Sequence, residues 1–301
     1  MVPGTQIGSM TAAEGIAADV IVIDLYETVA SQDKPEARLN AAEWLRVAGA
    51  SVIEQRPVGR WVRINSLESG LARDDLNAIM PGAPDGVLLP CAEGPEAVRQ
   101  LAAEIYELEH RHGLTPASTL IVPVVGETAR AAATVTDYLE SGHQRLAGLT
   151  WGANGLAAEL GMHGAHDTDG GWNEVLRHVR AQTLLTAHGC GIMAIEALSA
   201  DALDHEAVLL AAQKARRDGF TGMLVGDSSQ VAAVNAAFSP KAAEPEREMS
   251  ESLAASYDTD ALSRRSRPAD LSALSSAFPA RRRAERMQPE DLGSATILRP
   301  A

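Results

Sequence analysis

Short apolar runs recur along the first three quarters of this chain, and each is followed by a polar turn and by helix-like sequence. A run of about four to eight apolar residues between turn signals is typical of a strand buried on both faces. Strands that alternate with helices predict βαβ units and a parallel sheet. Eight such units predict an α/β fold, a (β/α)8 TIM barrel, with its active site at the carboxyl ends of the strands. The runs are Val2–Gly4, Val20–Leu25, Trp61–Asn65, Gly86–Pro90, Thr119–Val125, Leu146–Gly152, Gly191–Ile195 and Met223–Gly226.

Helical periodicity fills most of the segments between these runs. The clearest case is 95–108, where apolar residues form one stripe. Similar patterns predict helices over 33–45, 130–140, 172–188 and 206–217. We expect a barrel domain over residues 1–240 and a divergent polar C-terminal extension, partly helical and mobile, over 241–301. The first strand is too short to span a barrel wall. Either the natural start lies upstream of Met1, which we favour, or this first strand is unusually short.

Composition excludes several classes of partner. The formal net charge of −14 argues against nucleic acid and anionic membranes as partners. No apolar stretch approaches the ~18–20 residues of a membrane span, and no signal-like segment begins the chain. Cys91 and Cys190 lie in different units, so no disulfide framework is expected and a cytoplasmic location is predicted.

Polar residues at the strand ends are the candidates for function, and Arg63 is the most informative of them. Its guanidinium would be expensive to bury in an apolar strand without an anionic partner. That partner is either the carboxylate of a ligand or a structural ion pair with Asp24 or Glu27. Two interpretations of Asp24 and Glu27 are open. Either both side chains reach the barrel mouth, or Asp24 caps a turn and Glu27 is solvated. The full set of strand-end candidates is Asp24, Glu27, Arg63, Asn65, Cys91, Glu127, Asn154, Gly155, Glu196 and Asp227.

A metal site needs more than one of these residues. Glu127 follows strand five and is a suitable ligand for a hard cation such as Mg2+, which prefers two carboxylates. Strand six should supply the second, but Asn154 and Gly155 stand there and no carboxylate follows. His163 and His166 form a second candidate for a divalent ion, although a polar loop explains this Gly-rich segment better.

Several ordered motifs resemble the HpcH/HpaI aldolase superfamily, in its citrate lyase β-subunit-like and malyl-CoA lyase-like branch. Val62-Arg63-Ile64-Asn65 matches the family without a change, and Val22–Val29 follows the family's Ile-Leu-Asp-Leu-Glu-Asp-Ala-Val. The resemblance runs from Val2 to about Pro240. The other matching segments are Val2–Gly4, Lys34 with Arg38, Leu89–Glu93, Glu127–Arg130, Gly148–Gly161 and Gln230–Phe238.

The resemblance implies a TIM barrel that assembles as a homotrimer or hexamer and acts on a small carboxylate or acyl-CoA. It implies Mg2+-dependent cleavage or formation of a carbon–carbon bond in 2-oxo acids or 3-hydroxyacyl-CoA thioesters. Arg63 and Glu27 would be catalytic, and Glu127 and Asn154 would hold the metal. The substrate-binding residues would be Arg63, Asn65, Gly152 and Ala153.

Departures from the family motifs fall at the strand ends. Gly155 replaces the family's second metal-binding aspartate and Asn154 the neighbouring glutamate, so Mg2+ binding is expected to be weak or lost. Tyr26 replaces a glutamate and Cys91 a lysine. The strand-eight and C-terminal motifs of many lyases in this branch have no match.

Three functions therefore stay open. The first is an active lyase in which Asn154 or Asp227 takes over part of the metal site. The second is a non-catalytic paralogue, a pseudoenzyme that keeps the barrel for ligand binding or assembly. The third is unrelated chemistry through Tyr26 and Cys91, although a small apolar filler is the favoured interpretation of Cys91 because no histidine accompanies it.

Overall fold

The computed structural model describes residues 1–13, 15–50, 58–167, 171–197 and 204–239. The expected extension over 241–301 lies outside the described residues. The strands are β1 (Val2–Pro3), β2 (Val20–Asp24), β3 (Gly59–Arg63), β4 (Gly86–Leu89), β5 (Leu120–Val125), β6 (Gly148–Trp151), β7 (Met193–Ala197) and β8 (Gly222–Leu224). The α-helices are α1 (Ile7–Ala13), α2 (Lys34–Ala50), α3 (Ala72–Ile79), α4 (Pro95–His112), α5 (Ala129–Ala133), α6 (Ala153–Glu159), α7 (Glu174–Cys190), α8 (His205–Asp218) and α9 (Val231–Phe238). None of the helices in the described ranges is long and apolar enough to cross a membrane.

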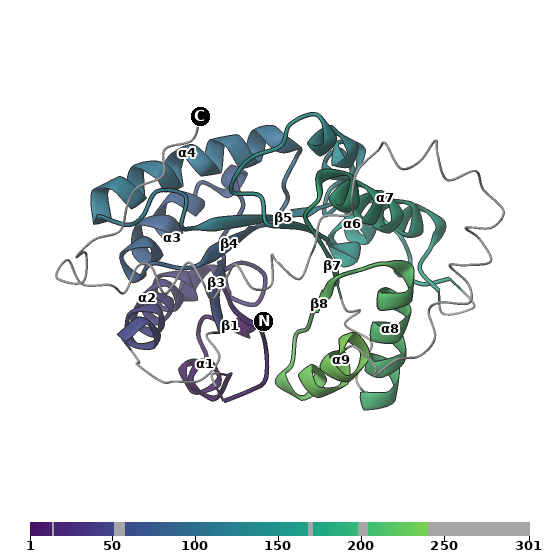
Figure 1. Cartoon of the computed structure of the whole chain (residues 1–301), viewed down its shortest axis with the longest axis horizontal. Helices are drawn as coiled ribbons and strands as arrows, with labels where there is room; N and C mark the ends of the chain where they lie inside the picture. The colour runs from purple at the N-terminus through teal and green to yellow at the C-terminus, as the bar shows by residue number, and fades with distance from the viewer. Residues whose placement is uncertain (14, 51–57, 168–170, 198–203, 240–301) are drawn as a thin grey trace, which may run out of the picture.

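The eight strands form one parallel sheet in which each strand pairs with its neighbours in sequence. The sheet curls, and helices such as α2, α4 and α7 cover its outer face (Figure 1). Within the described residues no ladder joins β8 to β1, although the Met1 amino group donates a hydrogen bond to the Val225 carbonyl just after β8. The predicted α/β fold is confirmed as a curled half-barrel of parallel strands.

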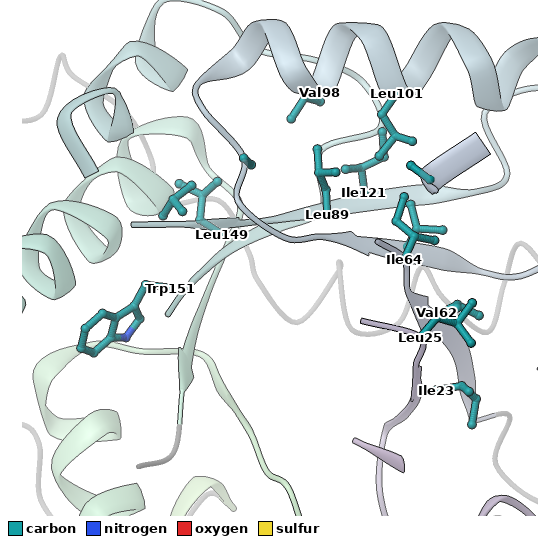
Figure 2. Close-up of a cluster of buried hydrophobic side chains, with 14 of the residues drawn as sticks. Ile23, Leu25, Val62, Ile64, Leu89, Val98, Leu101, Ile121, Leu149 and Trp151 are labelled. Atoms are coloured by element: carbon teal, nitrogen blue, oxygen red, sulfur yellow. The ribbon is translucent and has the colours of Figure 1, made fainter. Parts of the chain in front are cut away.

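Alternation along the strands gives the sheet an outer and an inner apolar face. Figure 2 shows the outer core, where Leu101 of α4 points toward Leu89 and Ile121 of the sheet. The side chains in this core are almost fully buried, and each buried leucine or isoleucine contributes about 1.5–3 kcal/mol. The same core includes Ile21 and Ile23 of β2, Val62 of β3, and Ile64 directly after β3.

The inner face of the sheet carries a second apolar cluster. This cluster consists of Val22, Trp61, Leu88 and Val122. Because side chains alternate along a strand, the next inner positions toward the carboxyl ends of β2 and β3 are Asp24 and Arg63. The same period that buries the apolar residues therefore places the charged residues at the open end of the sheet.

The pattern over 130–140 predicted one helix, and this prediction was wrong. Helix α5 ends at Ala133, and a 3-10 helix, η4 (Val135–Leu139), follows it. The hydroxyl of Thr134 donates to the carbonyls of Arg130 and Ala131, at 3.2 Å each. Such bonds from threonine to the preceding turn compete with the regular helix ladder and change its geometry.

Candidate functional site

A cavity of about 830 Å³ lies at the carboxyl ends of the strands. Most of the residues predicted for the site line it, although they come from separate strands, loops and helices. Those predicted lining residues are Glu27, Arg63, Glu127, Gly152, Ala153 and Asn154. Asn65, also predicted to bind substrate, is not among the lining residues.

Arg63 is the central residue of this cavity. Its side chain is only 5% exposed, and its guanidinium bridges two carboxylates. Nη1 lies 3.0 Å from Glu27 Oε2, and Nη2 lies 2.7 Å from Glu127 Oε1. The guanidinium also lies 4.9 Å from the centre of the Tyr26 ring. Burial opposes the charge, but Glu127, Asp24 and Glu27 outweigh it and raise the pKa of Arg63.

Both oxygens of the Glu127 carboxylate are engaged by donors from the protein. Oε1 accepts from Arg63, and Oε2 accepts from the backbone N–H of Cys91 at 2.6 Å. Burial is the largest influence and raises the pKa of Glu127, although Arg63 opposes it. The side chain crosses the α-carbon of Gly152, where a Cβ would lie 2.3 Å from Glu127 Cγ. The lack of a side chain at Gly152 therefore makes room for Glu127.

The second predicted metal position offers no carboxylate. Asn154 is exposed and lines the cavity, and Gly155 packs against Glu127. A Cβ at Gly155 would lie 3.0 Å from the Glu127 carbonyl oxygen, so the backbone of the β5–α5 turn already fills that space. Within the described ranges, no group of three or more His, Cys, Asp or Glu residues is placed to hold an ion. Of the two residues predicted to hold the metal, Glu127 therefore brings a carboxylate to the cavity and Asn154 brings an amide.

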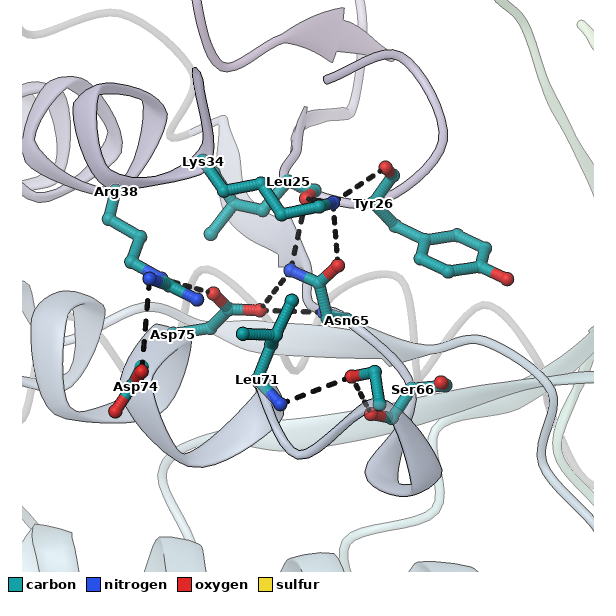
Figure 3. A network of polar contacts seen from close by, with 10 residues as sticks. Leu25, Tyr26, Lys34, Arg38, Asn65, Ser66, Leu71, Asp74 and Asp75 are labelled. Atoms are coloured by element: carbon teal, nitrogen blue, oxygen red, sulfur yellow. Dashed lines mark hydrogen bonds and ion pairs between the residues drawn. The ribbon is translucent and has the colours of Figure 1, made fainter. Parts of the chain in front are cut away.

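Asn65 belongs to a buried network behind the cavity (Figure 3). Its amide nitrogen donates to Asp75 Oδ2 at 2.7 Å and to the Leu25 carbonyl at 3.1 Å, and its amide oxygen accepts from Lys34 Nζ at 2.7 Å. Asp75 is fully buried and also accepts from Arg38 Nε at 2.6 Å. We propose that Asn65 positions the ends of β2 and β3, in place of the substrate contact that the sequence predicted.

Asp24 and Asp227 both hold turns at the rim. Asp24 is fully buried and accepts from the backbone N–H groups of Tyr26 and Thr28 at 3.0 and 2.9 Å. Asp227 caps the short helix after β8 and accepts from the N–H of Ser229 at 2.8 Å. Of the alternatives for Asp24, capping is the one that the structure shows.

Tyr26 and Cys91 lie together on one wall of the cavity. Tyr26 Oη and Cys91 Sγ are 3.5 Å apart, and Cys91 adopts a positive φ of 50°. Burial raises the pKa of the Cys91 thiol, and the hydrogen bond with Cys91 raises the pKa of Tyr26. A thiol that stays protonated is a poor nucleophile, so this geometry favours the interpretation of Cys91 as a packing residue.

Another part of the cavity wall is aromatic, and the strand-end analysis did not predict it. Trp151 and Trp172 meet edge to face with ring centres 5.2 Å apart, and both line the cavity. Trp151 Nε1 donates to Glu196 Oε1 at 2.6 Å, and Arg180 Nε holds the other Glu196 oxygen at 2.5 Å. Glu196 therefore orients an aromatic wall, a role that its position at the end of β7 did not reveal.

The histidine segment after α6 contacts Trp172 but does not itself line this cavity. The ring of His166 stacks on Trp172 with centres 4.4 Å apart. Residues 168–170 lie outside the described residues, and no metal-holding group forms in the described part of the segment. The structure thus shows His166 in an aromatic contact, and the choice between a metal site and a polar loop stays a prediction.

Comparison with known proteins identifies relatives of this fold and site. The sequence profile of the HpcH/HpaI aldolase/citrate lyase family matches residues 1–228. A citrate lyase subunit beta-like protein of Mycobacterium tuberculosis is 33% identical over 224 residues, which is 74% of this chain and 72% of the relative. The mitochondrial citramalyl-CoA lyase of Mus musculus is 29% identical over 249 residues, covering 79% of this chain and 70% of the relative.

Solved structures agree with this relationship. The protein CitE of Mycobacterium tuberculosis in complex with magnesium and acetoacetate superposes with a TM-score of 0.66 and 29% identity, covering 84% of this chain and 94% of that one. A complex of the same protein with magnesium, acetoacetate and coenzyme A gives a TM-score of 0.62, 27% identity, and coverage of 94% and 96%. The resemblance drawn from the motifs is confirmed. The chain belongs to the HpcH/HpaI aldolase/citrate lyase family.

Proposed function

We propose that this protein binds a small carboxylic acid, free or as its CoA thioester, with Arg63 holding the carboxylate. The observation that carries the proposal is the buried guanidinium of Arg63, which lines the cavity and already holds two carboxylates. A guanidinium presents N–H groups in a planar fork that suits carboxylate oxygens. Related structures contain the small carboxylates acetoacetate, pyruvate or oxaloacetate, and one of them contains coenzyme A beside acetoacetate.

We propose further that this binding does not require Mg2+ and that the protein is a non-catalytic member of the family. The support is the engagement of both Glu127 oxygens by Arg63 and Cys91, together with Gly155 where a second carboxylate is expected. In this arrangement Arg63 neutralises Glu127 and orients the ligand. Trp151 and Trp172 form the apolar wall of the cavity.

The second candidate is a carbon–carbon lyase that acts on 2-oxo acids or 3-hydroxyacyl-CoA thioesters with Mg2+. Its support is that Glu27 and Glu127 both bring carboxylate oxygens into the cavity and that related structures contain magnesium. Glu27 keeps its predicted catalytic role under this candidate. Under this candidate, β1 and β8 also close the sheet into a complete barrel, and the protein assembles as a homotrimer or hexamer. Sedimentation equilibrium tests the assembly.

The deciding experiment is isothermal titration of pyruvate into the protein, once in the presence of Mg2+ and once in the presence of EDTA. An assay of pyruvate release from citramalyl-CoA accompanies it. We expect binding in EDTA and no Mg2+-dependent release of product. Arg63→Met should weaken binding at least about tenfold, because hydrogen bonds to charged groups contribute about 1.5–3 kcal/mol. The exposed Arg99→Met is the matched control and should bind as the wild type does.

Each outcome separates the candidates. Binding or product release that appears only with Mg2+ supports the lyase and overturns the metal-independent proposal. Binding that survives Arg63→Met removes Arg63 as the carboxylate contact. If Arg63→Met does not fold, Arg63→Lys keeps the charge without the fork and should still weaken binding.

A further inference from the structure

We propose that Glu27 occupies the place on Arg63 that the carboxylate of a bound ligand takes, so that a ligand binds only when Glu27 moves away. The inference rests on the proposed binding of a carboxylate by Arg63. In the structure, Glu27 Oε2 lies 3.0 Å from Nη1 of Arg63. Glu27 is therefore an internal competitor for the ligand.

The two carboxylates on Arg63 are held very differently. The Glu27 side chain is 62% exposed, whereas that of Glu127 is 9% exposed. Glu127 has a second donor in the Cys91 N–H and packs on Gly152. Among the described residues, Arg63 is the only hydrogen-bond partner of the Glu27 carboxylate. Release of Glu27 therefore breaks one contact and returns a carboxylate to water, whereas release of Glu127 would leave a buried charge.

The charge on Arg63 limits how many carboxylates it can hold at once. Glu27 and Glu127 already surround one positive charge with two negative charges, and a ligand carboxylate would add a third. Three carboxylates around one guanidinium would repel one another strongly in a partly buried cavity. When Glu27 leaves, the number of negative charges around Arg63 returns to two, because the ligand carboxylate replaces the Glu27 carboxylate.

The geometry of Arg63 leaves donors for the incoming ligand. The guanidinium is planar and donates its hydrogen bonds in its own plane, and its carbon lies 4.9 Å from the centre of the Tyr26 ring. When Glu27 leaves, Nη1 is free to donate. Nε of Arg63 is buried and has no partner among the described residues, so it is a further unsatisfied donor beside the cavity. Nη2 stays with Glu127 and keeps the guanidinium in place.

The test is titration of pyruvate into protein stripped of metal with EDTA, comparing the wild type with Glu27→Gln. We expect Glu27→Gln to bind about two- to fivefold more tightly, the range for an ion pair with one exposed partner. The matched control is Glu159→Gln. Glu159 also lines the cavity, but its carboxylate accepts from the Ala129 N–H at 2.9 Å and is not paired with Arg63. This control measures how much tightening comes from the loss of one negative charge alone.

Equal tightening in both variants shows a general charge effect and overturns the role of Glu27. Weaker binding in Glu27→Gln also overturns it, because Glu27 would then assist the ligand. If the wild type binds pyruvate through Arg63 and Glu27→Gln changes nothing, the inference fails while the proposed function stands. If none of the proteins binds pyruvate, both fail. Circular dichroism of each variant confirms that the fold is intact.

Discussion

At the scale of single residues, the shape of the site depends on a glycine as much as on the charged groups. Glu127 lies where it does because Gly152 has no side chain, since a Cβ there would lie 2.3 Å from Glu127 Cγ. Cγ is close to the backbone, so Glu127 cannot avoid the contact by moving only its carboxylate. The ion pair with Arg63 therefore depends on a residue that makes no polar contact with it.

We predict that Gly152→Ala displaces Glu127 and disturbs the pairing with Arg63. Overpacking in a closely packed site costs about 1–3 kcal/mol, so the free energy of unfolding in urea should fall by that amount. Pyruvate binding should weaken as well. The control is Gly142→Ala, where a Cβ has nothing within 4 Å. Unchanged stability and binding in Gly152→Ala would show that the Glu127 loop adjusts freely.

Some residues of the site could be predicted from the sequence and others could not. Arg63 was predictable because a charged residue in an apolar strand needs a partner. Glu127 was predictable because it lies two residues past the end of β5. Trp172 and Glu159 also line the cavity, but Trp172 comes from a loop and Glu159 from the end of α6. Their placement depends on how the loops after β6 fold over the sheet, and no local pattern encodes that.

At the scale of elements, the strands were the most predictable part of the chain. The run over 86–90 became β4 (Gly86–Leu89), and the run over 119–125 became β5 (Leu120–Val125). Buried parallel strands have a strong apolar signal. Helix α6 was not predicted, because Gly155 interrupts its pattern and it spans only seven residues. Short helices of this kind depend on tertiary packing and have little signal of their own.

One buried network joins three of these elements behind the site. Lys34 begins α2, Asn65 follows β3, and Asp75 lies in α3 (Figure 3). Asp75 accepts from the Asn65 backbone N–H and amide at 2.7 Å each and from Arg38 at 2.6 Å. The network fixes the loop after β3 relative to both helices, and so fixes the strand end that carries Arg63.

We predict that Asp75→Asn destabilises the protein by about 3–5 kcal/mol, because it removes one partner of a buried ion pair. Asp74→Asn is a matched control, since Asp74 is the adjacent residue, is 65% exposed and lies 3.9 Å from Arg38. An exposed carboxylate at that distance contributes little, so this control should unfold as the wild type does. Urea unfolding followed by circular dichroism measures both. Similar losses in the two variants would contradict a special role for Asp75.

At the scale of the whole molecule, a second buried network lies at the amino-terminal end of the sheet, opposite the cavity. Glu109 of α4 pairs with Arg145, which precedes β6, through two hydrogen bonds of 2.7 and 2.6 Å. It also accepts from the backbone N–H groups of Ala117 and Thr119 at 2.9 and 3.0 Å. In barrels of this kind, the amino-terminal end serves stability while the carboxyl-terminal end serves function. Glu109 can therefore be changed without touching the site.

Glu109 should make the stability of the whole fold sensitive to acid. Burial opposes its ionisation, but Arg145 and the two N–H groups outweigh burial and hold the pKa of Glu109 below its usual range. A lowered pKa in the folded state means that the unfolded chain binds the proton more readily. The stabilisation is therefore complete above the ordinary glutamate pKa of about 4.3 and is lost as the pH falls through the lower value.

We predict that Glu109→Gln lowers the free energy of unfolding at pH 7 by about 3–5 kcal/mol, because it leaves Arg145 buried without its charge partner. The variant should also lose part of the acid sensitivity, so that its stability falls less steeply than that of the wild type below about pH 5. Urea unfolding between pH 3 and pH 7 measures both effects.

Glu107→Gln, on the exposed side of the same helix, is the control and should keep the wild-type profile. A Glu109→Gln profile parallel to that of the wild type would mean that other carboxylates govern acid unfolding. Pyruvate binding by the folded variant should stay unchanged, because the network and the cavity lie at opposite ends of the sheet.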